Sequence, residues 1–155
     1  MTDLFDGGCA CGTVRYRLNS APMFVHCCHC RDCQRQTGSA FVINALIETD
    51  RIVMVSGEPK PVAAPTDSGS PHDIYRCPKC QCAVWSDYGA RPALRFVRVG
   101  TLHDPGALAP DVHIFIRSKL PWVTLPKDVP SFEVYYDAER VWPKASLERR
   151  RAILG

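Results

Sequence analysis

The spacing of the cysteines constrains this chain more than any other feature of its sequence. Seven of the nine cysteines fall into three short patterns, Cys-x-Cys from Cys9, Cys-x-Cys-x-x-Cys from Cys28 and Cys-x-x-Cys from Cys77. Packing alone does not call for such a density of thiols. The odd total argues against complete pairing into disulfides, and clustered cysteines in a reducing compartment more often bind zinc. The sequence therefore predicts a fold organised around metal-binding corners.

The N-terminal sequence MTDLFDGGCACG has neither the basic n-region nor the apolar h-region of a signal peptide. No apolar run approaches the length of a membrane span, and the longest, AFVINALI, is interrupted by Asn44. We therefore expect a cytoplasmic protein with no membrane partner, in which thiols stay reduced. Its 155 residues fit a single domain with a hydrophobic core.

Alternating apolar and polar residues predict that most of the chain forms short strands. In GTVRYRL the apolar residues Val14, Tyr16 and Leu18 share one face, and Arg15 and Arg17 share the other. Further candidate strands are MFVHCC, AFVINALI, RIVMVSG, DIYRC, AVWS, LRFVRVG and VHIFIR. Turn-forming residues separate these runs, so the pattern indicates a mostly β fold of antiparallel strands.

Only two segments have a helical pattern. CRDCQRQTG predicts a helix of one or two turns that ends near Gly38, and SLERRRAIL (146–154) predicts a second helix capped by Ser146. Segments 60–73 and 102–111 are rich in turn formers and are predicted to be loops, which would carry His72 and His103. Segment 120–130 contains three prolines and is predicted to be an irregular extended arm.

Two cysteine pairs together can form a closed metal site. Alternate residues of an extended chain point the same way, so Cys9 and Cys11 can reach one ion. The turn Cys-Pro-Lys-Cys brings Cys77 and Cys80 together in the same way. Four thiolates form the usual structural zinc site, and we expect this one to contribute several kcal/mol of folding free energy.

The remaining pattern predicts an open zinc site. Cys28, Cys30 and Cys33 can converge on one ion and have no obvious partner pair elsewhere, which leaves one coordination position free. A free position distinguishes a catalytic zinc from a structural one. Three thiolates make the zinc soft, so it would favour a sulfur ligand and would deprotonate a bound thiol. We therefore expect two zinc ions per chain, one structural and one catalytic.

Neighbouring residues leave alternatives open. His26 lies on the same alternate face as Cys28 and could close the third site, and Cys82 shares a face with Cys80 and could displace an assigned ligand. Cys27 should face the core as a small hydrophobic residue. His29 is expected to brace the turn, and His113 to lie in the core or at its rim with a further role as a substrate contact left open.

Five motifs occur in the order found in one known family: GGCACGTVRY, CHCRDCQRQTGSAF, RCPKCQCAVW, VRVGTLHDP and HIFIRSKLPWVTLP. The chain resembles the glutathione-dependent formaldehyde-activating enzyme family, also called the GFA or CENP-V/GFA family. The resemblance runs from about Gly7 to Tyr136, so residues 1–155 are interpreted as one such domain with a C-terminal extension over 137–155. The chain departs from the family pattern at Gln81 and Cys82, where the family usually has Gly followed by Thr or Ser.

The resemblance implies a β-tent fold, in which antiparallel sheets lean on each other and are pinned by zinc. It implies a structural zinc on Cys9, Cys11, Cys77 and Cys80, and a catalytic zinc on Cys28, Cys30 and Cys33. Members of the family are carbon–sulfur lyases, and the founding activity joins formaldehyde and glutathione to S-hydroxymethylglutathione. The activity expected here is therefore addition of a thiol, glutathione, to formaldehyde or another small aldehyde.

Glutathione is anionic, so basic residues near the third pattern are candidates to bind its carboxylates. These are Arg31 and Arg35, and further along the chain Arg117 and Lys119. The rival interpretation is a non-catalytic zinc-stabilised module that binds protein or nucleic acid. The formal net charge of +3 is small, and the basic residues are not interleaved with aromatic residues as in a nucleic-acid-binding surface. We therefore expect no nucleic-acid partner. A homodimer is compatible with the sequence.

Overall fold

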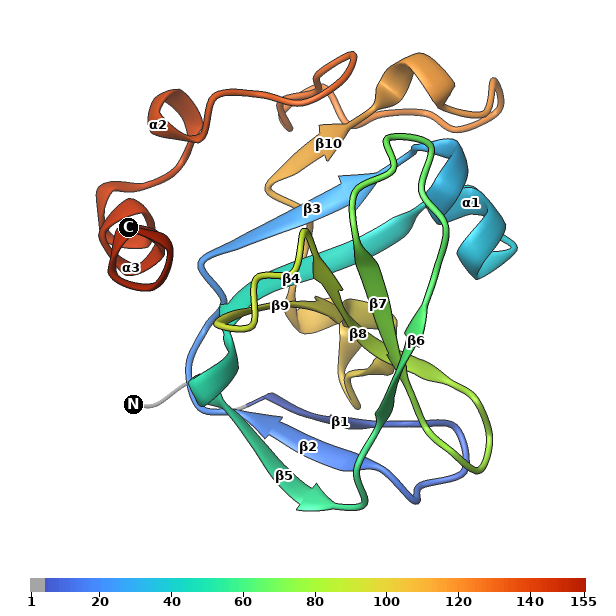
Figure 1. The fold of residues 1–155 in the computed structure, drawn as a ribbon. Coiled ribbons are helices and arrows are strands. Elements are labelled where there is room, and N and C mark those ends of the chain that lie inside the picture. The colour runs from blue at the N-terminus through green and yellow to red at the C-terminus, as the bar shows by residue number, and fades with distance from the viewer. Residues whose placement is uncertain (1–4) are drawn as a thin grey trace.

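The computed structural model describes residues 5–155, which form ten strands in two sheets (Figure 1). The smaller sheet has the order β1-β2-β5 and the larger one the order β10-β3-β4-β9-β8-β7-β6. The strands are β1 Phe5–Gly8, β2 Arg15–Leu18, β3 Phe24–Cys28, β4 Val42–Glu48, β5 Ile52–Ser56, β6 Lys60–Ala63, β7 His72–Arg76, β8 Ala83–Tyr88, β9 Leu94–Arg98 and β10 Val112–Ile114. The predicted mostly β class is confirmed.

All strand pairs are antiparallel except one. Strand β10 lies parallel to β3, with Val112 opposite His26 and Ile114 opposite Cys28. The predicted antiparallel pattern therefore holds for the other strand pairs, and this edge is the one exception. The long stretch between β9 and β10 gives the chain enough length to cross back and pair in the parallel sense, which a short hairpin turn cannot do.

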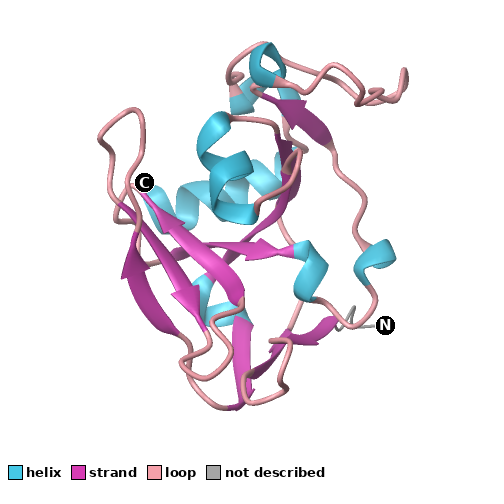
Figure 2. Ribbon diagram, turned by 90° about the vertical axis from the view of Figure 1, so that its right-hand side faces the viewer, coloured by secondary structure: helices cyan, strands magenta, loops and turns pink. Residues whose placement is uncertain are grey.

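The three α-helices lie at the end of the molecule away from the three-stranded sheet (Figure 1, Figure 2). They are α1 Arg31–Thr37, α2 Ala138–Val141 and α3 Lys144–Leu154, and four 3₁₀ turns are η1 Thr49–Arg51, η2 Val99–Thr101, η3 Pro105–Ala107 and η4 Ile116–Ser118. In the part of the chain that the structure describes, no helix has the length and apolar character needed to cross a bilayer.

The first predicted helix is confirmed, and the second begins earlier than expected. Gly38 ends α1 in the left-handed conformation that glycine favours, with φ of 64°. Helix α3 starts at Lys144 after Pro143, so Ser146 is not its cap. The Ser146 hydroxyl instead donates to the Met23 carbonyl oxygen at 2.7 Å, which ties the helix to the start of β3. The short α2 was not predicted.

The predicted loop over 60–73 is wrong at both ends. Residues 60–63 form β6, whose Pro61 is tolerated because β6 is the free edge of the sheet. His72 begins β7 and is buried, with its ring stacked on Tyr88 at 3.9 Å between centroids. Cross-strand pairing of β6 with β7 therefore outweighs the turn-forming composition of this segment. The arm over 120–130 contains neither helix nor strand, as predicted.

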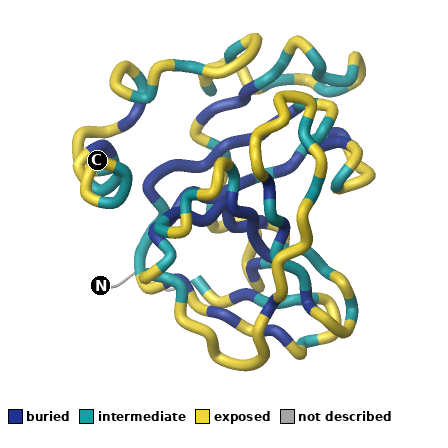
Figure 3. The backbone as a smooth tube through the Cα atoms, viewed as in Figure 1, coloured by how far each residue is buried: buried dark blue, intermediate teal, exposed yellow. Residues whose placement is uncertain are grey.

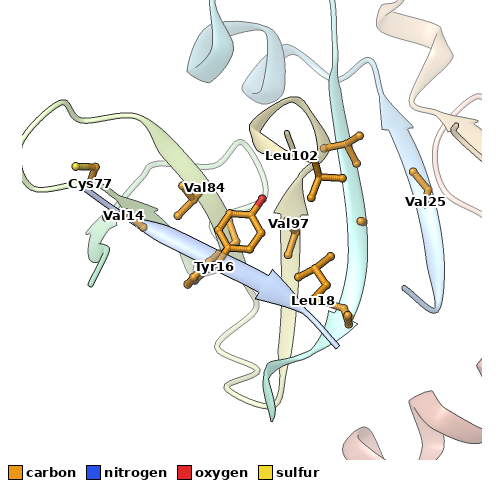
Figure 4. Packing of buried hydrophobic residues seen from close by; sticks show 12 residues of the cluster. Val14, Tyr16, Leu18, Val25, Cys77, Val84, Val97 and Leu102 are labelled. Carbon is orange, nitrogen blue, oxygen red and sulfur yellow. The ribbon is translucent and has the colours of Figure 1, made fainter. Parts of the chain in front are cut away.

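One core cluster lies between the two sheets (Figure 4). The alternation predicted around β2 is confirmed, because Val14, Tyr16 and Leu18 are at most 1% exposed. Buried stretches of the chain gather in the middle of the molecule (Figure 3). The Tyr16 ring meets Trp85 of the larger sheet edge-on, with centroids 5.4 Å apart. Its hydroxyl bonds the Thr101 hydroxyl at 2.6 Å. This partly buried polar link helps to position the smaller sheet against the larger one.

A second cluster packs the C-terminal segment onto the other end of the larger sheet. The Trp142 ring stacks on Phe24 with centroids 5.1 Å apart, and Leu147 is also buried there. Arg149 of α3 makes two charged hydrogen bonds to the buried Glu48, at 2.7 and 2.6 Å. The C-terminal segment therefore packs against strands β3 and β4, which also carry Cys28 and Asn44.

Candidate metal centres and cavity

The two outer cysteine pairs meet in one four-cysteine cluster. The sulfur atoms of Cys9, Cys11, Cys77 and Cys80 all lie within 4.8 Å of one another. The Cys9–Cys11 and Cys11–Cys77 sulfur distances are 3.6 and 3.8 Å. A tetrahedron with zinc–sulfur bonds of about 2.3 Å requires sulfur separations of about 3.8 Å. The cluster therefore fits a closed zinc site, and it joins the turn after β1 to the turn between β7 and β8.

The turn that carries Cys77 and Cys80 contains a residue in an unusual conformation. Gln81 has φ of 64°, in the left-handed region that side chains rarely adopt. Its backbone N–H donates to the Cys77 carbonyl oxygen at 2.9 Å, and its side chain donates to the Pro78 oxygen at 3.2 Å. The turn thus keeps the shape that a glycine favours although glutamine occupies the position.

Cys28, Cys30 and Cys33 form a separate three-cysteine cluster, again with all sulfurs within 4.8 Å of one another. Cys28 ends β3, Cys30 caps α1, and Cys33 lies in the first turn of that helix. The Cys30 sulfur accepts the Cys33 N–H at 3.3 Å, so the start of the helix fixes the relative positions of these two thiols. Three donors within a short segment are brought together by local structure alone.

The three thiols cannot all ionise without a nearby cation. Hydrogen bonds from the Cys28 and Cys33 thiols lower the pKa of Cys30 well below its usual range. Hydrogen bonds with Cys30 and Cys33, together with burial, raise the pKa of Cys28. Like charges at this distance repel, so a bound cation is needed for all three to act as thiolates. The donor set suits a soft divalent ion such as zinc.

The structure does not bring His26 or Cys82 into either cluster. His26 Nε2 lies 2.5 Å from the Tyr136 hydroxyl, which also accepts the Trp142 indole N–H at 2.6 Å. The Cys82 thiol donates to the Ala83 carbonyl oxygen at 3.8 Å. Within residues 5–155, no fourth Cys, His, Asp or Glu donor lies within 4.8 Å of all three sulfurs of Cys28, Cys30 and Cys33. The protein thus leaves one coordination position of this cluster free.

A cavity of about 490 Å³ opens beside the three-cysteine cluster. One part of its wall is aromatic and aliphatic, another carries hydroxyl groups, and two arginines reach it from distant parts of the chain. The lining residues are His26, Cys28, Cys30, Asp32, Cys33, Asn44, Thr66, Ser68, Ser70, Pro71, Tyr88, Gly89, Arg91, Phe96, Ile114, Phe115, Tyr135 and Arg150. The cavity has the size and mixed lining typical of a site for a small molecule.

The arginines that line the cavity are Arg91 and Arg150, and the sequence patterns did not point to either. Arg31 is exposed and its guanidinium donates to the Gln34 side-chain oxygen. Arg35 is exposed on α1, and neither residue is part of the cavity wall. Arg91 lies in the β8–β9 connection and Arg150 in α3, so no local spacing relates them to the cysteines.

The two other candidate cations are also outside the wall. Arg117 is exposed. The Lys119 ammonium donates to the backbone oxygens of Leu120 and Val123, at 3.2 and 2.8 Å. The folded chain therefore presents a different pair of cations to the cavity than the sequence suggested.

A third group of side chains is buried beside the cluster. His29 Nε2 lies 2.9 Å from His113 Nδ1 and 3.5 Å from the Cys27 sulfur. Burial lowers the pKa of His29 to about 4, so both histidines can share a proton in the neutral state. Because Cys27 and His113 are paired across β3 and β10, this group braces the parallel edge beside Cys28. The core position expected for Cys27 is confirmed.

Comparison with known proteins found one family model and two similar proteins of interest here. A family model described as glutathione-dependent formaldehyde-activating enzyme matches residues 4–118. A Halomonas elongata protein whose name assigns it provisionally to these enzymes is 27% identical over 127 residues, which cover 79% of this chain and 81% of that protein. A crystal structure of a Rhodobacter sphaeroides protein superposes with a TM-score of 0.46 at 17% identity, covering 82% of this chain and 99% of that one.

Proposed function

This chain belongs to the glutathione-dependent formaldehyde-activating enzyme family, and from that premise we propose that it adds glutathione to formaldehyde or another small aldehyde at the three-cysteine cluster. It would act in the cytoplasm as a carbon–sulfur lyase, since the reverse reaction cleaves the bond formed. In the forward direction, the thiol sulfur forms a bond to the aldehyde carbon, and the thiol proton is transferred to the carbonyl oxygen, which becomes a hydroxyl group. No oxidant or reductant is needed.

Two zinc ions are proposed per chain. Cys9, Cys11, Cys77 and Cys80 would hold the structural ion, and Cys28, Cys30 and Cys33 would hold the second. When bound at the second site, zinc supplies Lewis acidity that lowers the pKa of a thiol in the free position. The observation that carries the proposal is that three convergent thiols with a free fourth position form part of the wall of a cavity large enough for a small molecule.

The cavity residues would orient the two substrates. Arg91 and Arg150 can bind the carboxylates of glutathione by charged hydrogen bonds, while the earlier candidates Arg31 and Arg35 would act only from outside the wall. Phe96, Ile114 and Tyr135 form apolar wall against which the aldehyde substituent can pack. Holding both reactants next to the cluster turns a bimolecular encounter into an oriented reaction.

The test is acceleration of the exchange between glutathione plus formaldehyde and their adduct, measured by two-dimensional exchange NMR on zinc-loaded protein. We expect wild-type protein to accelerate the exchange and Cys30→Ser to lose this effect. Serine is itself a favoured helix cap, so α1 should still form in the variant.

Cys82→Ser is the matched control, because Cys82 is a half-buried cysteine outside both clusters. It should retain the wild-type rate. Wild-type protein with two zinc ions that leaves the exchange rate of formaldehyde and of larger aldehydes unchanged would contradict the proposal, as would full activity in Cys30→Ser.

A further inference from the structure

Arg98, the last residue of β9, is a buried cation without a carboxylate partner. The residue is 7% exposed, and within residues 5–155 it forms no ion pair with Asp or Glu. Its guanidinium donates to two neutral acceptors, the Asn44 side-chain oxygen at 2.6 Å and the Ser86 hydroxyl at 2.9 Å. A buried charge is costly unless an opposite charge lies nearby.

The buried carboxylates of the described chain are already paired with other arginines. Glu48 binds Arg149 at 2.6 Å, and Asp87 lies 3.5 Å from Arg95. Neutral acceptors satisfy the hydrogen-bonding capacity of a guanidinium but do not balance its charge. The negative charge that balances Arg98 must therefore come from another kind of group.

Thiolates of the three-cysteine cluster would supply negative charge on the same face of the sheet. His26, Asn44 and Arg98 are opposite one another across β3, β4 and β9, so their side chains share one face. Two members of this row, His26 and Asn44, line the cavity together with the three cysteines. Cys28 follows His26 by two residues and thus points to the same face.

Arg98 is connected to the cavity beside the cluster. Asn44, whose side-chain oxygen accepts from Arg98 at 2.6 Å, lines that cavity together with Cys28, Cys30 and Cys33. Tyr88, whose hydroxyl lies 3.9 Å from the Cys33 sulfur, also lines the cavity. Aromatic and apolar side chains around this point keep the local dielectric constant low, so a charge at Arg98 is weakly screened.

We infer that Arg98 is a positioning residue that supplies the counter-charge of the three-cysteine metal centre. A divalent ion with three thiolates carries one net negative charge, and binding of a fourth thiolate adds another. A fixed cation on the same face of the sheet as the cluster offsets the negative charge of the three thiolates and the further charge added when the anionic thiol binds. This inference rests on the proposed function, because it assumes that the cluster holds zinc.

The test compares zinc affinity in full-length variants by competition with a chromophoric chelator. Arg98→Gln removes the charge, and the second zinc should bind about 10–100-fold more weakly, the effect usual for groups that support metal ligands. Arg98→Lys restores the charge and should recover most of the affinity. The four-cysteine site is the internal reference, since its zinc should bind equally tightly in all variants.

Arg95→Gln is the matched control. Arg95 lies on the same strand and is similarly buried at 9%, but it is paired with Asp87 and stacked on Tyr75. If zinc binding in Arg98→Gln fell only because the loss of a buried arginine disturbs the fold, Arg95→Gln should weaken zinc binding to the same extent. A normal second site in Arg98→Gln, an Arg98→Lys variant as weak as Arg98→Gln, or an equal loss in Arg95→Gln would each overturn the inference.

Asn44→Asp provides a second test if Arg98→Gln does not fold. It places a carboxylate at the atom that already accepts from Arg98, so the guanidinium stays but its charge is neutralised locally. We expect weaker zinc binding in this variant. The absorption of the cobalt-substituted protein should show that the same three thiolates still bind the ion. Unchanged or tighter zinc binding would overturn the inference. Wild-type protein that binds only one zinc would instead overturn the proposed function, and the inference with it.

Discussion

Arg91→Met should weaken glutathione binding without disabling the reaction. Arg91 Nε donates to the Tyr88 carbonyl oxygen at 2.8 Å, and its guanidinium lies 5.6 Å from the Phe96 ring centroid. Within residues 5–155 the terminal nitrogens of Arg91 make no hydrogen bond or ion pair, so they are free to bind a carboxylate at the cavity wall. Methionine keeps an unbranched stem over Phe96 and removes only the charged donors.

The size of the effect follows from the exposure of the site. A hydrogen bond to a charged group contributes about 1.5–3 kcal/mol, and Arg91 is half-buried, so water partly screens it. We therefore expect a loss near the lower limit, about 1.5 kcal/mol, or about a tenfold rise in the KM for glutathione. The contact is made in the ground state and in the transition state alike, so kcat should change little.

Steady-state kinetics with glutathione and formaldehyde varied separately measure this effect. The KM for the aldehyde should stay unchanged in Arg91→Met, because the charge binds only the thiol substrate. Arg35→Met is the control, since Arg35 is an exposed cation near the cluster but outside the cavity wall. A tenfold rise in KM for Arg35→Met together with a normal value for Arg91→Met would refute the assignment of the cavity arginines and favour the cations predicted from sequence.

Three further predictions concern stability. Cys77→Ser should lose one zinc per chain and, because the four-cysteine cluster joins distant segments, several kcal/mol of unfolding free energy, as measured by metal analysis and urea denaturation. Burial lowers the pKa of His72 to about 4 from 6.5, so the unfolded chain binds more protons between these values. Stability should fall as pH drops from 6.5 to 4, by at most about 3 kcal/mol from this residue, and the fall should be shallower in His72→Gln in a urea series at each pH. Gln81→Gly removes the side chain from a residue whose backbone lies in the left-handed region, so it should stabilise the protein by about 0.5–1 kcal/mol and raise its Tm. A lower Tm would show that the side-chain hydrogen bond to the Pro78 oxygen outweighs the backbone strain.

Short-range patterns in the sequence determined much of this protein. The Cys-x-Cys-x-x-Cys spacing brings three thiols together because they lie at one strand end and in the first turn of the next helix. Alternation around β2 places Val14, Tyr16 and Leu18 in the core, and Gly38 ends α1 as expected. Such features depend on backbone geometry over a few residues, so spacing alone predicts them. That zinc occupies the clusters remains a prediction.

The tertiary structure decided what surrounds the clusters. It brings Arg91 and Arg150 to the cavity from a connection and a C-terminal helix, places Arg98 in a row with Asn44 and His26, and pairs His26 with Tyr136. It also turns part of a predicted loop into β6 and makes β10 parallel to β3. Each of these depends on contacts between segments far apart in the chain, whose partners are set by the order and register of the strands. No local pattern records that order, so the thiols could be predicted from the sequence, whereas the charges and walls that would select their substrate could not.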